Sequence, residues 1–286
     1  MRTGMTICER YRLERRLGSG GQASVWRCHD LVTGREVAVK VVDFEEDPRK
    51  ARRATREIQT LQSLTDPHTV RILDTGRDDD DHYVYIVMPV ITGESLSDRL
   101  RRGGMGVADV VSIIQGVSSS LSEAHSLGIC HRDVKPSNIM IHASGAAVLL
   151  DFGIASSLDQ SSSLTATGTV IGTLPYMAPE VVRGEKATPA SDVYFLGAVM
   201  YECACGRPPF KADTMHALLM AITHGNYPPP SCATELRGLI VQMLDLDPGQ
   251  RPTAQDLLEG SSAAELTHIL RTYGEERFAS RIAAAI

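Results

Sequence analysis

The sequence lacks the features that would indicate a membrane protein, a secreted protein or a polyanion-binding protein. Its longest apolar runs, such as YIVMPVI, are too short to span a bilayer. The opening residues MRTGMTICER lack the apolar core of a secretory signal. The formal net charge of -6 gives no overall basic field for nucleic acid or anionic lipid. We therefore expect a cytoplasmic protein with no membrane segment and no nucleic-acid partner.

The six cysteines are scattered along the chain, at positions 8, 28, 130, 203, 205 and 232. The C-x-C at Cys203 and Cys205 has no second ligand pair at zinc-site spacing, and the six positions form no disulfide framework. We therefore expect reduced thiols with structural roles rather than a metal site.

The apolar pattern makes the first part of the chain rich in strands. At 286 residues and 43% hydrophobic, the chain is long enough for one large domain or two lobes with separate cores. From Tyr11 to about Pro89, the runs YRLERRLG, SVWRCHD, EVAVKVV, VRILDTG and HYVYIVMPV predict strands. One helix is predicted among them, because four apolar residues are three or four positions apart: Ala54, Ile58, Leu61 and Leu64.

After Ser95 the chain turns helical. Helical spacing is found in LSDRL, DVVSIIQGVSSSLSEAHSLG, DVYFLGAVMYECACG, MHALLMAITHG and LRGLIVQML. Two short strand-like pieces, NIMIH and AAVLLDFG, lie among these helices. The Ser- and Thr-rich stretch from Ser156 to Thr173 has no periodicity and is longer than most ordered connections, which indicates a functional segment. We predict an α+β fold, with a small β-rich lobe followed by a larger, mainly α lobe.

The stretch LGSGGQASVW, between two predicted strands, has glycines where a turn could bring backbone N–H groups onto phosphate oxygens. By itself a Gly-rich turn between strands is usually only a hairpin. A dinucleotide-binding fingerprint is excluded, because that motif needs a helix to follow and a strand follows here.

Lys40 ends the apolar strand EVAVK, so its ammonium group needs a counter-charge or must lose its proton. Glu57, in the helical run ATREIQTLQSL, is the candidate partner. The alternative is a surface lysine whose charged end reaches solvent.

These stretches occur in an order that resembles a known family. The Gly-rich loop, VAVK, a helical Glu, HRDVKPSN, DFG and MAPE together resemble the signature set of protein kinases. The resemblance runs from about Tyr11 to Glu259 and is greatest to bacterial Hanks-type Ser/Thr protein kinases. It implies a bilobal kinase fold, with an N-lobe and hinge at 1–91, a C-lobe at 92–262 and an extension at 263–286.

The resemblance assigns catalytic roles in ATP-dependent transfer of a phosphoryl group to protein Ser or Thr. Asp133 accepts or orients the proton of the substrate hydroxyl, and Lys135 reaches the γ-phosphate. Asn138 and Asp151 are hard oxygen ligands that suit Mg²⁺, for which Mn²⁺ can substitute. Thr173 contacts the catalytic aspartate and lysine and helps to select Ser and Thr hydroxyls. Lys40 and Glu57 complete the set as the family's ion pair.

The same resemblance places ATP between the lobes. The residues expected to contact it are Leu17, Gly18, Ser19, Gly20, Gly21, Val25, Ala38, Lys40, Met88, Pro89, Ile91 and Met140. Two positions depart from the family pattern. Pro89 opens the hinge without an N–H group, which is tolerable because only its carbonyl and the N–H of Ile91 are needed. Ala23 stands where a third loop glycine often occurs, so we expect a stiffer loop that still binds nucleotide.

Arg132 precedes the catalytic aspartate and has no evident counter-ion, so an arriving phosphate would be attracted to it. By resemblance Thr165 and Thr167 are the autophosphorylated pair that orders this segment. Autophosphorylation in trans implies self-association of the chain.

Three scaffold roles also follow from the resemblance. Glu180 of APE pairs with Arg251 in a buried ion pair, whose rupture costs roughly 3–5 kcal/mol. Asp192 accepts hydrogen bonds from the backbone near His131. The side chains of Leu61, His131 and Phe152 stack as part of a spine that joins the lobes.

The last stretch, 263–286, lies outside the kinase resemblance. Its apolar residues have helical spacing, and its run YGEERFASRIAAAI resembles a segment of bacterial methyltransferases that modify a cytidine of small-subunit ribosomal RNA. The methyl-donor loop and the catalytic residues of that family are not found in the sequence, so methyltransferase activity is not implied. Two interpretations of this extension remain open: a packing or docking helix whose likeness is a coincidence, and mimicry of that family or a partner surface shared with it.

Two other functions compete with an active protein kinase. A pseudokinase scaffold usually lacks the metal aspartate, the base or the lysine, and all three residue types are present here. A small-molecule phosphotransferase of the aminoglycoside type shares the fold but lacks the platform from Thr173 to Glu180 that receives a polypeptide. The sequence does not identify the physiological substrate.

Overall fold

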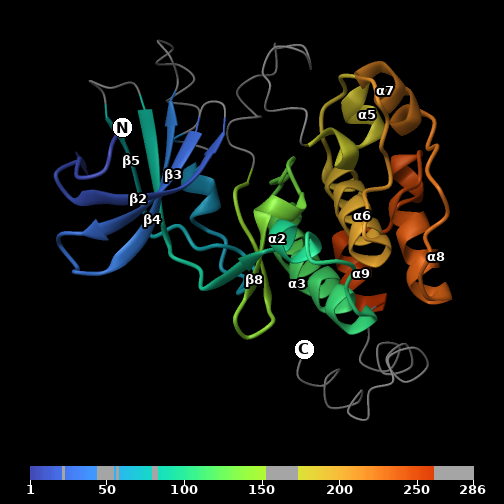
Figure 1. Ribbon diagram of the computed structural model, residues 1–286, viewed down its shortest axis with the longest axis horizontal. Helices are drawn as coiled ribbons and strands as arrows, with labels where there is room; N and C mark the ends of the chain where they lie inside the picture. The colour runs from blue at the N-terminus through green and yellow to red at the C-terminus, as the bar shows by residue number, and fades with distance from the viewer. Residues whose placement is uncertain (21–22, 44–54, 56–57, 79–82, 153–172, 261–286) are drawn as a thin grey trace. The chain divides into compact units, whose positions relative to one another are not determined.

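The computed structural model in Figure 1 describes residues 1–20, 23–43, 55, 58–78, 83–152 and 173–260. These residues form two compact units. The first, the sheet unit, contains the described residues within 1–65 and 70–92, and the second, the helical unit, contains those within 66–69, 93–152 and 173–260.

The sheet unit is one antiparallel sheet with strand order β1-β2-β3-β4-β6-β5. Its strands are β1 (Thr6–Ile7), β2 (Tyr11–Gly20), β3 (Ala23–Asp30), β4 (Glu36–Asp43), β5 (Asp74–Asp78) and β6 (Tyr83–Pro89). Four of the five predicted strands are confirmed with small changes of boundary. The run VRILDTG is strand only from Asp74.

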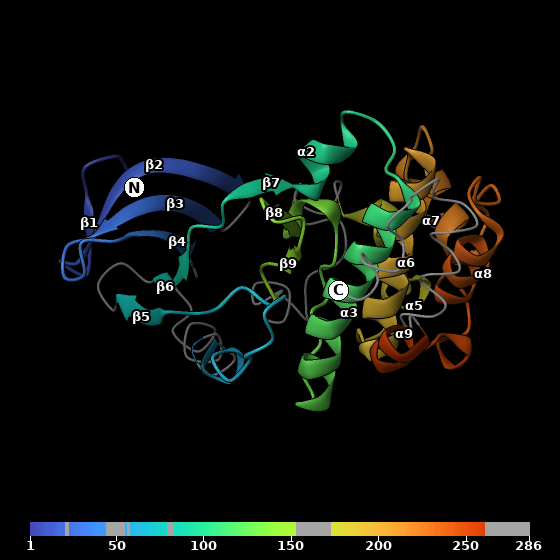
Figure 2. The ribbon, with the colours of Figure 1, turned by 90° about the horizontal axis from the view of Figure 1, so that it is seen from below.

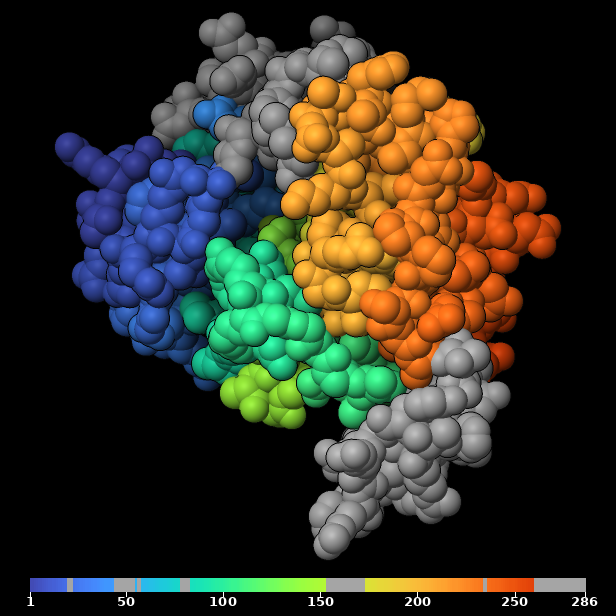
Figure 3. All heavy atoms as spheres, turned by 45° about the vertical axis from the view of Figure 1, so that its right-hand side comes forward, coloured from blue at the N-terminus to red at the C-terminus, as the bar shows by residue number. Residues whose placement is uncertain are grey.

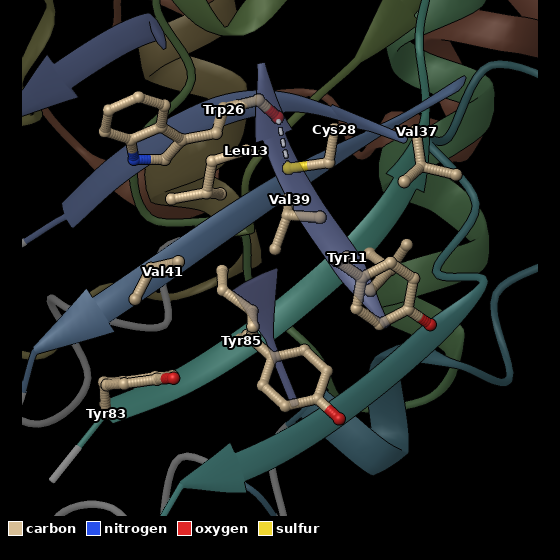
Figure 4. Close-up of a cluster of buried hydrophobic side chains, with 11 residues drawn as sticks. Tyr11, Leu13, Trp26, Cys28, Val37, Val39, Val41, Tyr83 and Tyr85 are labelled. Carbon is tan, nitrogen blue, oxygen red and sulfur yellow. Dashed lines mark hydrogen bonds between the residues drawn. The ribbon is translucent and has the colours of Figure 1, made fainter. Parts of the chain in front are cut away.

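The side chains of the strands alternate between buried and more exposed positions, and the buried ones form the core of the sheet unit. Trp26, Cys28 and Asp30 of β3 are buried while the residues between them are partly exposed, as the two-residue period of a strand requires. Figure 4 shows Trp26 and Cys28 on the same side as Tyr11, Val39 and the other labelled side chains of this core. The predicted helix is found at the described residues 58–61, where its apolar side chains are buried.

The helical unit is built around α6 (Pro189–Cys205). Every residue from Ser191 to Tyr201 is buried, because the helix is apolar on all sides and packs against neighbours all round. The other helices are α2 (Leu96–Leu100), α3 (Val107–Ser126), α5 (Pro179–Val182), α7 (Met215–Thr223), α8 (Thr234–Met243) and α9 (Ala254–Gly260). Figure 2 shows α3 beside α6 and α9, and α3 packs against both of these helices.

Short elements connect these helices. A three-stranded antiparallel sheet has the order β7-β8-β9, with β7 (Gly93–Ser95), β8 (Ile139–His142) and β9 (Ala147–Leu149). Three 3-10 turns complete the unit: η1 (Pro136–Asn138), η2 (Leu174–Tyr176) and η3 (Pro248–Gln250). Over the part of the chain that the structure describes, no helix combines the length and the apolar character needed to cross a membrane.

Residues 66–69 interrupt the sheet unit in the chain. They belong to the helical unit, because their backbone is bound to it. The Asp66 N–H group donates to Glu123 of α3 at 2.9 Å, and the Leu149 N–H group of β9 donates to the His68 carbonyl at 2.7 Å. The main division falls after Thr92, one residue beyond the predicted one.

Candidate active site

The loop HRDVKPSN, between α3 and β8, is held by one carboxylate of α6. Asp192 is fully buried, and its two oxygens accept from the backbone N–H groups of His131 and Arg132, each at 2.7 Å. The Nε2 atom of His125 lies 2.9 Å from the same carboxylate. Arg132 has a φ of 69°, a left-handed conformation that costs a non-glycine residue about 1–3 kcal/mol. The hydrogen bonds that these N–H groups donate to Asp192 offset this strain and fix the course of the loop.

His131 connects the loop to the DFG segment. Its side chain is fully buried, and its Nε2 atom lies 2.7 Å from the carbonyl oxygen of Leu150. Burial lowers the pKa of His131, so the ring is neutral at pH 7. The Asp133 N–H group donates to Nδ1 at 3.3 Å, which assigns the ring proton to Nε2 as donor to Leu150. The His131 ring lies 4.7 Å from the Phe152 ring.

Asp133 is the centre of a hydrogen-bonded group, here called the Asp133 cluster, made by Asp133, Lys135, Asn138 and Thr173. The Lys135 ammonium lies 2.8 Å from Asp133 Oδ2 and 2.9 Å from the Thr173 hydroxyl. Asn138 Nδ2 donates to the same Oδ2 at 2.9 Å, and the Thr173 hydroxyl lies 3.4 Å from Oδ1. Both oxygens of the carboxylate are therefore held in a fixed orientation beside a cation.

Asn138 and Asp151 are the two residues expected to supply oxygen ligands to a metal cation. Asn138 uses Nδ2 twice, toward Asp133 Oδ2 and toward the Asp133 carbonyl, so its orientation leaves Oδ1 as its outward acceptor. Asp151, with a φ of 52°, supplies a carboxylate at the start of DFG. An amide oxygen with a carboxylate suits Mg²⁺, which takes its other ligands from phosphate and water. Among the described residues, no group of three or more His, Cys, Asp or Glu side chains is arranged to hold a metal ion.

The segment after Thr173 is anchored to α6. The Tyr176 hydroxyl of η2 donates to Glu202 at 2.6 Å. Burial raises the pKa of Glu202, and the hydrogen bond from Tyr176 opposes that shift. This contact fixes the turn that carries Thr173 into the Asp133 cluster.

The buried ion pair of Glu180 and Arg251, at the end of this segment, is joined by two hydrogen bonds. Arg251 Nη1 and Nη2 donate to Glu180 Oε1 and Oε2 at 2.7 and 2.9 Å. The Ser191 hydroxyl donates to Glu180 at 2.7 Å, and the Arg251 guanidinium lies 4.8 Å from the centre of the Tyr194 ring.

Strand register in the sheet unit brings together four residues expected at the nucleotide. Val25 pairs with Lys40, and Ala38 pairs with Met88. Paired residues share a face, and so do residues two apart, so these four side chains lie on one face of the sheet. Gly18 pairs with Val25 and continues this row to β2.

The remaining expected residues are placed as follows. Leu17, Ser19 and Gly20 lie in β2, Pro89 ends β6, and Met140 lies in β8 of the helical unit. Ile91 follows β6 and is half-buried. The other expected positions, Gly21, Glu57, Thr165 and Thr167, lie outside the described residues.

Sequence reasoning missed His125 and the Tyr176–Glu202 pair. His125 is predicted only as a helical residue, although it lies six positions before His131 at the same end of α3. A polar residue that close to the HRD motif is a usable signal. Glu202 lies in an apolar helical run where a single carboxylate had no evident partner in the sequence.

Comparison with known proteins gives relatives for nearly the whole chain. The chain is 38% identical over 251 residues to the serine/threonine-protein kinase PknA of Mycobacterium tuberculosis. This alignment covers 86% of this chain and 58% of the relative. The chain is 39% identical over 231 residues to the probable serine/threonine-protein kinase PknB of Corynebacterium glutamicum, covering 79% and 36%. It is 35% identical over 266 residues to the serine/threonine-protein kinase PrkC of Bacillus subtilis, covering 90% and 41%.

The chain therefore spans less than two thirds of the length of these curated relatives. The MraW methylase family matches residues 241–286, which include the extension that lies outside the described residues. The protein kinase domain family matches residues 11–261, which include every residue of the Asp133 cluster. The chain accordingly belongs to the protein kinase domain family, and the prediction of a bacterial Hanks-type Ser/Thr kinase domain is confirmed.

Proposed function

We propose that this chain is a protein serine/threonine kinase that transfers the γ-phosphoryl group of ATP to Ser and Thr hydroxyls of proteins, with Mg²⁺. The observation that carries the proposal is the Asp133 cluster. Phosphoryl transfer asks a protein mainly to position groups and to balance charge. The cluster holds a carboxylate, an ammonium and a hydroxyl within hydrogen-bond distance of one another.

Asp133 acts as the base that accepts the proton of the substrate hydroxyl. Its carboxylate is oriented by Asn138 and the Thr173 hydroxyl, so an incoming hydroxyl meets an acceptor of fixed direction. Lys135 balances negative charge at the transferred phosphate. The Thr173 hydroxyl contacts both Asp133 and Lys135. Thr173 therefore couples the base to the segment that receives a polypeptide substrate.

The nucleotide contacts in this proposal follow the kinase family. Val25, Ala38 and Met88 of the sheet unit contact the adenine ring, and Lys40 contacts the phosphates together with the Gly-rich loop. These roles are supported by the shared sheet face of the first three residues. When bound, Mg²⁺ neutralises phosphate charge, and the residues that would hold it are Asn138 and Asp151. Mn²⁺ can replace it, because both ions accept oxygen ligands.

The segment before Thr173 controls activity in this proposal. Autophosphorylation at Thr165 and Thr167 supplies negative charge that pairs with Arg132, whose backbone is already fixed by Asp192. Phosphorylation in trans requires two copies to associate. Protein substrates are the partners, and a cytoplasmic location fits six cysteines that are all free thiols.

The test compares the wild-type chain with Asp133→Asn and with Asp109→Asn, a matched control in the exposed first turn of α3. Each protein is incubated with radiolabelled ATP, Mg²⁺ and a general protein substrate, and the labelled sites are mapped. We expect Asp133→Asn to lose roughly 100- to 10,000-fold in transfer rate, the contribution of a positioned base. The Asp109 variant should keep the wild-type rate. Equal labelling by the wild type and Asp133→Asn would disprove the assignment.

A further inference from the structure

Two cysteines lie near each other where α6 ends and the chain approaches α8. Cys205 is the last residue of α6, and Cys232 lies two positions before the start of α8. Ser231, next to Cys232, makes two contacts with the Cys205 sulfur. Its N–H group donates to Cys205 Sγ at 3.4 Å, and its hydroxyl donates at 3.8 Å. The Cys205 sulfur is therefore in contact with the residue adjacent to Cys232.

A disulfide requires the Cys232 sulfur to take the place beside Cys205 Sγ that the neighbouring Ser231 now occupies. Consecutive Cα atoms are about 3.8 Å apart, and disulfide-bonded cysteines have Cα atoms about 4.4–6.8 Å apart. Cys232 follows Ser231 directly, so a local rearrangement of residues 231–233, which lie between the prolines at 228–230 and the start of α8, brings its sulfur to Cys205 Sγ.

The titration of neighbouring groups agrees with this proximity. Burial raises the pKa of the Cys232 thiol, and the charge of nearby Cys205 raises it further, while Arg237 opposes the shift. Burial also raises the pKa of Tyr201, and both Cys205 and Cys232 add to that shift. The Tyr201 hydroxyl donates to the Pro228 carbonyl at 2.9 Å, so this ring holds the segment before Cys232 against α6.

Cys205 and Cys232 differ in solvent exposure from the cysteines that are packed in the core. Cys28 and Cys203 are completely buried, as packing cysteines usually are. Cys205 and Cys232 are each partly exposed and are free thiols. A small oxidant can reach such sulfur atoms, whereas a buried thiol is protected. Figure 3 shows that much of the orange-coloured part of the helical unit lies at the molecular surface.

We propose that Cys205 and Cys232 form a reversible intramolecular disulfide when the protein meets a peroxide. One thiolate attacks a peroxide oxygen, giving a sulfenic acid and hydroxide, which takes up the proton released by the thiol to become water. The second sulfur attacks the sulfenic sulfur, the S–O bond breaks, and a second water leaves. Two thiols are oxidised and one hydrogen peroxide is reduced to two waters, so atoms and electrons balance.

The disulfide closes a covalent loop around α7. The loop includes Phe210 and Tyr227, whose rings meet edge to face at 5.5 Å, and Tyr227 makes the same kind of contact with Tyr201 at 5.9 Å. The bond therefore joins two ends of a segment that is already packed. Constraining the unfolded chain in this way raises the unfolding midpoint, by roughly 5–10 °C for a loop of this size.

The test uses the full chain as wild type, Cys205→Ser, Cys232→Ser and Cys8→Ser, the last a control that removes another exposed thiol. Each protein is treated with a small excess of hydrogen peroxide, remaining thiols are alkylated, and unreduced digests are mapped by mass spectrometry. Wild type and Cys8→Ser should give a peptide pair joined through Cys205 and Cys232, lighter by two hydrogen atoms. Their unfolding midpoint should rise, and a dithiol reductant should reverse both changes.

The two serine variants at the pair should form no such peptide and show no rise in midpoint. The map of the wild type decides the matter even if a variant folds poorly. A bond between Cys203 and Cys205, a bond between two chains, or unlinked Cys205 and Cys232 peptides after oxidation of other thiols would each overturn the proposal. No kinase assay is involved, so the result is independent of the proposed function.

Discussion

The buried pair of Glu180 and Arg251 gives a stability prediction with a definite size. Glu180 is 4% exposed and Arg251 is 7% exposed, so neither charge has water to replace its partner. Replacing Arg251 with Met removes both hydrogen bonds to Glu180 and leaves a carboxylate buried beside Ser191 alone. Breaking a buried pair in this way costs about 3–5 kcal/mol, out of a total stability of about 5–15 kcal/mol for a typical protein.

A double-mutant cycle separates the pair from the side chains around it. The second single variant is Glu180→Leu, and the double variant combines it with Arg251→Met. Replacing both charges by apolar groups removes the uncompensated charge, so the double variant should be more stable than Arg251→Met alone. The control is Arg101→Met, because Arg101 and Asp98 form an exposed pair worth about 0–1 kcal/mol.

The assay is urea denaturation followed by circular dichroism, which reports mainly on helices and therefore on the unit that contains the pair. The reasoning fails if Arg251→Met loses less than about 1 kcal/mol. It also fails if the two single losses simply add in the double variant, since that would mean that the charges do not interact.

The same pair sets a dependence on pH. Burial pushes the pKa of Glu180 up, but the hydrogen bonds from Arg251 and Ser191 together outweigh it, so the net direction is down from 4.5. A carboxyl with a lowered pKa in the folded state adds stability above its unfolded pKa and loses it as the pH falls through the folded value. Wild type should therefore lose stability below about pH 4.5 more steeply than Glu180→Gln, measured as unfolding midpoints across that range.

Three further predictions concern activity. Thr173→Ala removes a hydrogen bond to each of two charged groups and should lower the transfer rate roughly 10- to 100-fold, while Thr173→Ser retains most of it in the same radiolabel assay. Asp192→Asn weakens the support of the HRD loop and should lower kcat with little change in KM for ATP, because Asp192 contacts only the protein backbone and His125 in the described structure. Removal of residues 263–286 should leave the transfer rate within about twofold of wild type, since the kinase family match ends at residue 261. A large loss of transfer rate would show that the extension supports catalysis.

The regular elements were predictable because their residues follow a single period. In β4 the β-branched run EVAVKVV predicts a strand, and the structure places that strand in the sheet at Glu36–Asp43. In α3 the buried residues Val110, Ile114, Val117 and Leu121 are three or four apart, as an amphipathic helix requires. In both cases the local preference and the buried face agree.

The site was predictable only in part, because its contacts join segments far apart in the sequence. The resemblance already places Thr173 in contact with Asp133 and Lys135, but it does not give the hydrogen bond from Asn138 to Asp133 or the contact that anchors η2. That anchor is the hydrogen bond from Tyr176 to Glu202, which the helical pattern of α6 does not reveal. β1 was also missed, since a two-residue strand has no detectable period.

The crossing of residues 66–69 into the helical unit limits how the chain can be cut. A fragment that begins at Gly93 would lack the His68 ring, which approaches α3 at Gly116 so closely that a Cβ there would lie 2.6 Å from Nδ1. It would also lose the acceptor for the Leu149 N–H group and expose the apolar surface of α3 behind it. The helical unit should therefore fold in isolation only when a peptide spanning 66–69 is supplied or spliced back.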